Sequence, residues 1–332
     1  MDARSRTAAL SAGLVLFVTV SPLPGANEKK TPSSAEGPAV MWHEPTDIRS
    51  RNLFLGRGGS KNAPHGPFTF VKEDSGGTTP KFVVKNRNGD EWKVKLGPEA
   101  KPETTASRFV WAVGYDTDVD YFALELRVHG LPHKLHRGQN LLGPDGSVQN
   151  ARLEKVSGDK IGTWHWKRNA FTGTRELNGL RVLMALINNW DLKDMNTAIY
   201  QEGNNRVFLI GDLGASFGAA GRSRAADSKG NPVAYSQSQF VRSVHDDTVD
   251  FMAPARPSWF YLVNPKEYLS RVRMEWIGKG VPREDVRWMA QWLARLSPRQ
   301  IRDAFRAGGY SPEETEQFAQ ALERRIAALT DL

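Results

Sequence analysis

The order of elements between residues 174 and 214 constrains this 332-residue chain more than any other feature. Apolar residues recur every three to four positions over residues 174–187, which predicts an amphipathic helix. A polar loop follows at 188–196, and two short apolar runs joined by a polar turn then predict a β-hairpin over 197–210. The hairpin runs directly into Gly211-Asp-Leu-Gly214.

This order brings together three residues whose side chains carry carboxylate or amide oxygens. Because the two ends of a hairpin lie side by side, we expect Asn196 at its entry and Asp212 at its exit to be neighbours. Oxygen donors of this kind suit Mg²⁺, and Asp191 in the preceding loop is left free to accept a proton. Taken singly, each carboxylate also fits a helix cap or a strand-end turn. Taken together, they favour phosphoryl transfer.

The front half of the chain is predicted to form strands and one helix. Runs at 68–73, 81–85 and 91–96 read as strands, separated by turns that contain Gly76-Gly77 and Asn88-Gly89. In the third run, period-two alternation places Lys93 and Lys95 on one face, opposite an apolar trio. A helix over 103–113 and a strand over 120–128 complete a small antiparallel sheet with one helix. Such lysines are often only solvated, and Gly56-Arg-Gly-Gly59 is a second candidate for a phosphate loop.

Two motifs of the back half resemble those of protein kinases. Asp191-Leu-Lys-Asp-Met-Asn196 resembles the catalytic loop D-L-K-x-x-N, and Asp212-Leu-Gly214 resembles the metal motif D-F-G, in the same order around a hairpin. The resemblance covers roughly residues 65–260 and extends to the front half, with its strand, glycine turn, lysine strand and helix with a glutamate. The chain is therefore similar to the atypical protein-kinase-like superfamily, the group of secreted, CotH, HipA-like and lipid-kinase-like kinases.

The resemblance implies a nucleotide site in the front half. Lys95 would hold the α- and β-phosphates of ATP, with Lys93 as the alternate because both lysines share a face. Glu103 would orient the lysine, and the turn with Gly76 and Gly77 would cover the phosphates. ATP or another nucleotide is the implied cofactor.

The resemblance also implies roles for the residues of the back half. Asp191 would be the catalytic base, and Lys193 would lie near the transferring phosphate. Asn196 and Asp212 would bind Mg²⁺. Some positions depart from the usual pattern: Asn189-Trp190 stands where His-Arg is common, and Leu213 replaces the phenylalanine. The departures point to an atypical kinase.

The first residues resemble a secretory signal peptide. Arg4 and Arg6 precede an uncharged apolar run over 8–20, and small residues follow up to Ala26. The run is shorter than the roughly 20 residues of a membrane-spanning helix, so we expect cleavage after 1–26 rather than stable membrane insertion. A retained anchor is the alternative. Either outcome predicts a location outside the cytoplasm, periplasmic or secreted, and the polar residues 27–64 read as a linker or arm.

Composition excludes several classes of protein. The chain has no cysteine, which excludes a disulfide scaffold, a cysteine nucleophile and cysteine-ligated metal sites. Lys and Arg number 45 against 37 Asp and Glu, a net charge of +8 that is spread along the chain. This spread indicates anionic ligands only weakly, and no nucleic-acid partner is expected.

These features predict an α+β fold of two kinase-like lobes. The small lobe would span 65–130, with an antiparallel sheet and one helix, and the mainly helical large lobe would span 131–332. The predicted activity is Mg²⁺-dependent nucleotide binding and phosphoryl transfer to an unknown protein, lipid or small-molecule acceptor. The alternatives are an inactive pseudokinase that serves as a binding module, and a secreted carbohydrate-acting or carbohydrate-binding protein. The carbohydrate alternative requires Trp164 and Trp166 to line an open groove.

Overall fold

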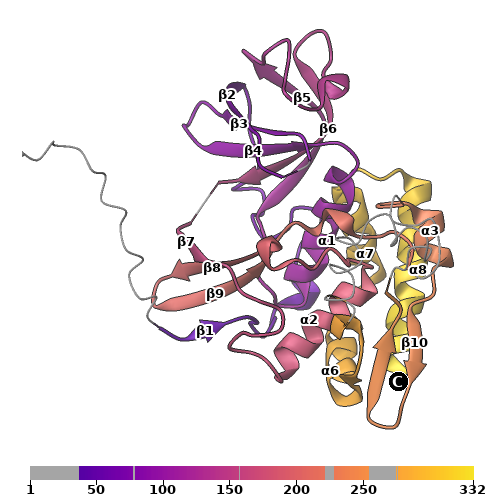
Figure 1. The fold of residues 1–332 in the computed structure, drawn as a ribbon. Helices are drawn as coiled ribbons and strands as arrows, with labels where there is room; N and C mark the ends of the chain where they lie inside the picture. Colours follow the sequence, from indigo (N-terminus) through magenta and orange to yellow (C-terminus); the bar gives the residue numbers. More distant parts are fainter. Residues whose placement is uncertain (1–36, 78, 157, 221–227, 254–273, 275) are drawn as a thin grey trace, which may run out of the picture. The chain divides into compact units, whose positions relative to one another are not determined.

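The computed structural model describes residues 37–77, 79–156, 158–220, 228–253, 274 and 276–332 (Figure 1). The predicted signal peptide, 1–26, lies outside the described residues. Ala35–Leu332 form one compact unit that contains two hydrophobic cores, one inside a β-barrel and one among the helices. The mixed α and β composition expected from the sequence is confirmed, whereas the division into two lobes stays a prediction.

The front half forms a closed barrel rather than an open sheet. Its strands, in the order in which they pair, are β2 (Phe68–Asp74), β3 (Lys81–Lys85), β4 (Glu91–Leu96), β6 (Ser147–Lys155) and β5 (Asp120–His129). The barrel closes through a parallel pairing of β2 with β5, and its other pairings are antiparallel. The sheet therefore extends past residue 130, where the sequence placed its end, because β6 pairs with both β4 and β5.

Alternation along β4 decides what the barrel encloses. Trp92, Val94 and Leu96 are buried in the barrel core, as the apolar trio predicted. Lys93 and Lys95 consequently lie on the outer face of the same strand. The helix α1 (Ala100–Ala112) follows β4 and buries Phe109 and Val110 in the larger core.

The second half combines a small sheet with helices. The sheet order is β1 (Ala39–Val40), β9 (Asn205–Ile210), β8 (Thr197–Glu202) and β7 (Lys160–Gly162), with β1 parallel to β9. The described helices are α2 (Arg175–Leu186), α3 (Pro232–Gln237), α6 (Arg283–Leu293), α7 (Pro298–Ala307) and α8 (Pro312–Thr330). A three-stranded sheet contains β10 (Val241–Val244), β11 (Thr248–Phe251) and β12 (Val281–Pro282). The predicted helix and hairpin over 174–210 are thus observed as α2, β8 and β9.

Residues 37–63 are part of the fold and not the linker that their composition suggested. Trp42 packs edge-on against Trp288 and Trp292, with ring centroids 4.9 and 5.5 Å away, and its Nε1 donates a hydrogen bond to the carbonyl of Val113. Farther along, Leu53 is buried in the larger core. A polar and proline-rich composition predicts a linker, but a few long-range contacts of large side chains are enough to hold such a segment in place.

Candidate functional site

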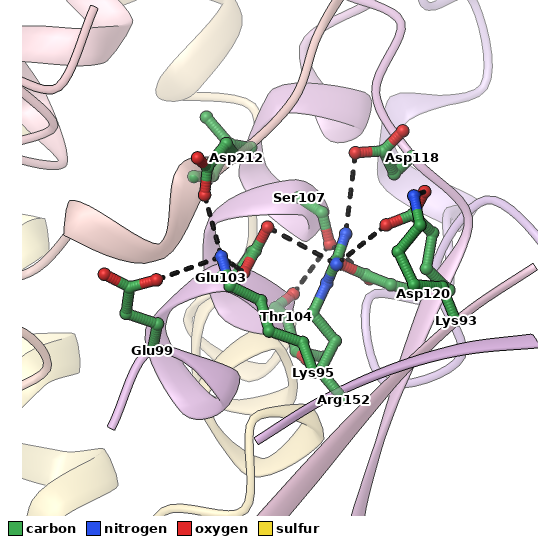
Figure 2. Close-up of polar contacts among 12 residues, drawn as sticks. Lys93, Lys95, Glu99, Glu103, Thr104, Ser107, Asp118, Asp120, Arg152 and Asp212 are labelled. Atoms are coloured by element: carbon green, nitrogen blue, oxygen red, sulfur yellow. Dashed lines mark hydrogen bonds and ion pairs between the residues drawn. The ribbon is translucent and has the colours of Figure 1, made fainter. Parts of the chain in front are cut away.

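Lys95 lies at the centre of a charged cluster where three elements meet (Figure 2). Its Nζ is 2.8 Å from Oε2 of Glu103 on α1 and 2.7 Å from Oδ1 of Asp212, which follows β9. A third carboxylate, that of Glu99, lies 3.0 Å from the same nitrogen. The structure thus brings together three residues that the sequence singled out and adds Glu99, which it did not.

Burial and charge oppose each other at Lys95 and Glu103. Burial alone would lower the pKa of Lys95, but the carboxylates of Glu103, Asp212 and Glu99 outweigh it and raise that pKa. Burial raises the pKa of Glu103, and the charges of Arg152 and Lys95 only partly offset this effect. The ammonium is therefore charged at every physiological pH.

Glu99 connects Lys95 with the segment that follows Asp212. Its Oε1 pairs with Lys229, and its Oε2 accepts a hydrogen bond from Oγ1 of Thr79 at 3.0 Å. Burial would raise the pKa of Glu99, but Lys95 and Lys229 together lower it to about 2. Gly214 makes room for this side chain, because a Cβ there would lie 2.7 Å from the Cβ of Glu99. The sequence signal that could have identified Glu99 is its position one helical turn before Glu103.

Arg152 on β6 is the second residue that sequence reasoning missed. It is buried, and Figure 2 shows it among the carboxylates of the cluster; its guanidinium lies 3.4 Å from Glu103 and 2.8 Å from Asp120. Asp120 also pairs with Arg108 of α1 at 2.8 Å. This network fixes α1 against the barrel and so fixes the carboxylate that holds Lys95. Pairing of β6 with β4 places Arg152 opposite Lys95, a register that the sequence does not reveal.

Lys93, the alternate to Lys95, points into a different set of contacts. Its Nζ lies 3.2 Å from Oε1 of Glu154, its neighbour across the β4–β6 pair. The described contacts of Lys93 include neither Glu103 nor Asp212. The geometry therefore selects Lys95 as the lysine held by the α1 glutamate.

The loop before β8 positions Asp191. The backbone N–H of Asp191 donates to Oδ1 of the buried Asn189 at 3.2 Å, and its carbonyl accepts a hydrogen bond from Nδ2 of Asn196 at 2.8 Å. The Nζ of Lys193 lies 2.7 Å from Oδ1 of Asp191. Asn189, noted in the sequence as a departure from the kinase pattern, thus holds the backbone of the loop.

The hairpin brings Asn196 next to the segment with Asp212, as predicted. Thr197 pairs with Ile210, and one step farther the N–H of Gly211 donates to the carbonyl of Asn196 at 3.0 Å. Asp212 itself has a left-handed backbone, with φ +50°, a conformation in which Asp is enriched among non-glycine residues.

The predicted phosphate loop is a turn that Asp74 and Arg137 hold by hydrogen bonds. The N–H of Gly76 donates to Oδ1 of Asp74 at 2.9 Å, and the guanidinium of Arg137 donates to the carbonyls of Gly77 and Ser75. The competing glycine cluster packs against α1 instead. A Cβ on Gly56 would lie 2.5 Å from the guanidinium of Arg108.

Trp164 and Trp166 do not line a groove. Both are buried, with ring centroids 4.9 Å apart, and Nε1 of Trp164 donates to the carbonyl of Leu209 at 2.9 Å. The carbohydrate alternative required these rings to be open to solvent, so the structure removes its main support.

The described residues contain neither a cluster of metal-ligating side chains nor a membrane-spanning helix. No group of three or more His, Asp or Glu side chains is placed to hold a metal ion among them. No helix in the described part of the chain has the length and apolar character needed to cross a membrane.

Comparison with known proteins gives matches among solved structures only. No family model matches the sequence, and no curated protein matches it either. The proinflammatory kinase CtkA of Helicobacter pylori matches 81% of this chain and 98% of its own at 12% identity, with a TM-score of 0.44. A Golgi casein kinase matches 86% of this chain and 79% of its own at 10% identity, with a TM-score of 0.30. At these TM-scores the two matches carry no argument, and the geometry of the site alone supports the function proposed next.

Proposed function

We propose that the protein binds ATP or a related nucleotide and transfers a phosphoryl group from it in an Mg²⁺-dependent reaction. The observation that carries this proposal is the convergence of Lys95, Glu103 and Asp212 from β4, α1 and the turn after β9. A permanently charged lysine on a rigid strand suits phosphate groups, because phosphoryl transfer depends mainly on positioning and charge neutralisation.

The unequal exposure of the two carboxylates supports this assignment. The side chain of Glu103 is 3% exposed and is held by Arg152 as well as Lys95, so it stays in place. The side chain of Asp212 is 46% exposed, so it is free to turn from Lys95 toward a cation. When Asp212 turns away, one N–H donor of the Lys95 ammonium becomes available for phosphate oxygens.

The residues present fit a magnesium ion. Asn196 uses its amide nitrogen on the carbonyl of Asp191, which leaves Oδ1 for a cation, and Asp212 offers a carboxylate. Both are hard oxygen donors. Bound Mg²⁺ would supply neutralisation of the phosphate charge at this position.

Asp191 is proposed as the general base, with Lys193 as its neutralising partner. In the transfer step, the acceptor hydroxyl gives its proton to Asp191 while its oxygen forms a bond to the terminal phosphorus. The bond from that phosphorus to the bridging oxygen breaks, and the nucleoside diphosphate leaves. The Nζ of Lys193 lies 2.7 Å from Oδ1 of Asp191 and so is next to the carboxylate that accepts the proton.

A thermal-shift titration with nucleotides tests the proposal. Saturation at 100 times Kd stabilises the folded protein by about 2.7 kcal/mol, which gives a clear rise in Tm. Asp212→Ala and Lys95→Met should lose this rise, whereas Asp246→Ala, at an exposed position of the β10–β11 hairpin, should keep it. Failure of every nucleoside triphosphate to shift the unmodified protein would refute nucleotide binding.

The catalytic step has its own test. Asp191→Ala should abolish phosphoryl transfer, including nucleotide hydrolysis, while leaving nucleotide affinity largely intact. Unchanged turnover in this variant would remove Asp191 as the base. Binding without transfer in the unmodified protein would indicate the pseudokinase alternative.

The proposed location outside the cytoplasm rests on residues 1–26 alone. Intact-mass measurement of the protein recovered from the periplasm or medium tests it. Loss of about 26 residues is the expected result, and a full-length mass in the cytoplasmic fraction would contradict it.

A further inference from the structure

Lys229 lies beside the proposed phosphate site although it is far from Lys95 in sequence. The two lysines bind the two oxygens of one carboxylate: Lys229 contacts Oε1 of Glu99, and Lys95 lies 3.0 Å from Oε2. Backbone hydrogen bonds hold this part of the chain in place, from Gly230 to the carbonyl of Ser216 at 3.0 Å and from Asn231 to that of Phe217 at 3.1 Å. Lys229 is thereby anchored to the segment that directly follows the Asp212 motif.

The carboxylate between the lysines is fixed. Glu99 accepts a hydrogen bond from Thr79 and packs against Gly214, where no side chain would fit. The side chain of Lys229 is 34% exposed, against 10% for Lys95. Lys229 is therefore the more accessible ammonium of the pair.

We propose that Lys229 is a second phosphate-binding residue, spaced from Lys95 by Glu99, and that the two lysines select nucleoside di- and triphosphates over monophosphates. This inference rests on the proposed function. Lys95 holds one part of the polyphosphate, and Lys229 holds the next.

The local charge balance supports this role. With Asp212 turned to a cation, Lys95 and Lys229 balance the charges of Glu99 and Glu103. Without Lys229, the same set would carry a net negative charge toward an incoming polyphosphate. Lys229 therefore offsets the charge of Glu99 on the side from which the polyphosphate would enter.

Calorimetric titration of the full chain with ATP, ADP and AMP in the presence of Mg²⁺ tests the proposal. Lys229→Met should weaken ATP and ADP binding at least tenfold, the effect of one lost charge-assisted hydrogen bond, and should change AMP binding less than threefold. Lys155→Met is the matched control. Its side chain is 28% exposed, and alternation places it on the face of β6 opposite Arg152 and Glu154. A loss of ATP affinity no larger than in this control, or an equal loss for ATP and AMP, would overturn the proposal.

Two further variants separate direct contact from charge balance and from misfolding. Lys229→Arg, which keeps the charge, should retain ATP affinity within threefold. If Lys229 acted only by neutralising Glu99, then Glu99→Gln would restore ATP affinity to Lys229→Met, and such restoration would overturn the proposed contact. No nucleotide binding by the unmodified protein would refute the proposed function itself, whereas unchanged affinity in Lys229→Met refutes only this inference.

Discussion

Replacement of Arg152 by methionine tests the buried charge network behind the site. The side chain of Arg152 is 3% exposed, and its guanidinium reaches four carboxylates, those of Asp120, Glu154, Glu103 and Asp118, at 2.8, 2.9, 3.4 and 3.5 Å. Removal of one partner from a buried ion pair costs about 3–5 kcal/mol, because the remaining charge stays buried without compensation. Glu103 and Asp120 keep Lys95 and Arg108 as partners. We therefore expect Arg152→Met to lower the free energy of unfolding by about 4 kcal/mol at pH 8.

The pH dependence gives this prediction a second, independent check. Burial raises the pKa of Glu103 and of Asp118 and the charge of Arg152 opposes this effect, so loss of Arg152 should raise both folded-state pKa values further above their unfolded values. Their contribution then favours the folded state at low pH and is lost as pH rises, so the destabilisation should be smaller at pH 5 than at pH 8. Urea unfolding at both pH values measures the two quantities.

Arg127→Met is the matched control on the neighbouring strand. Arg127 is 76% exposed and pairs with Glu125 at 3.0 Å, so its loss should produce no measurable change in stability. If Arg152→Met were as stable as this control, or lost more stability at pH 5 than at pH 8, the assignment of Arg152 as the centre of the network would be wrong.

Three other substitutions test separate contacts, each by urea unfolding. Burial raises the pKa of Asp118 to about 8, so ionisation of Asp118 destabilises the folded state as pH rises from about 4 to 8. Between pH 5 and pH 9, the free energy of unfolding of Asp118→Asn should therefore rise by at least about 1.4 kcal/mol relative to that of the unmodified protein. A difference between the two proteins that does not change with pH would contradict this. Trp42→Ala should lose about 3 kcal/mol, since its ring lies 4.9 and 5.5 Å from two other tryptophan rings; a change below about 1 kcal/mol would show that residues 37–63 act as a linker after all. Gly214→Ala should lower the free energy of unfolding by about 1–3 kcal/mol, because its Cβ would lie 2.7 Å from Glu99. Gly162→Ala, with open space at its Cβ, should not lower it, and equal effects of the two substitutions would argue against the clash.

The elements of the back half were readable from sequence because their signals are local. The helix predicted over 174–187 is α2, Arg175–Leu186, and the predicted hairpin is β8 and β9. Apolar spacing and turn residues specify such elements over a few neighbouring positions. The proximity of Asn196 to the Asp212 segment followed from hairpin geometry alone and is confirmed by the hydrogen bond from Gly211.

Features that depend on distant pairings were missed. Strand β6 pairs with both β4 and β5 and lies beyond the long connection after β5, and the local pattern of residues 147–155 does not identify these partners. For Trp164 and Trp166 the sequence favoured packing in a core over an exposed stacking role, and the structure buries both rings. Composition also predicted a linker at residues 37–63, whereas contacts of Trp42 with two other tryptophan rings hold this segment on the fold.

The choice between Lys93 and Lys95 shows what the sequence determines by itself and what requires the tertiary structure. Period-two alternation specified from sequence that both lysines share one face of β4, with an apolar trio on the other. Only the tertiary structure distinguishes them, because Lys95 meets carboxylates of α1 and of the turn after β9, whereas Lys93 meets Glu154 of β6. The physical reason is that a strand's own residues determine which face a side chain occupies, while the charge that stabilises it comes from whichever distant elements pack on that face.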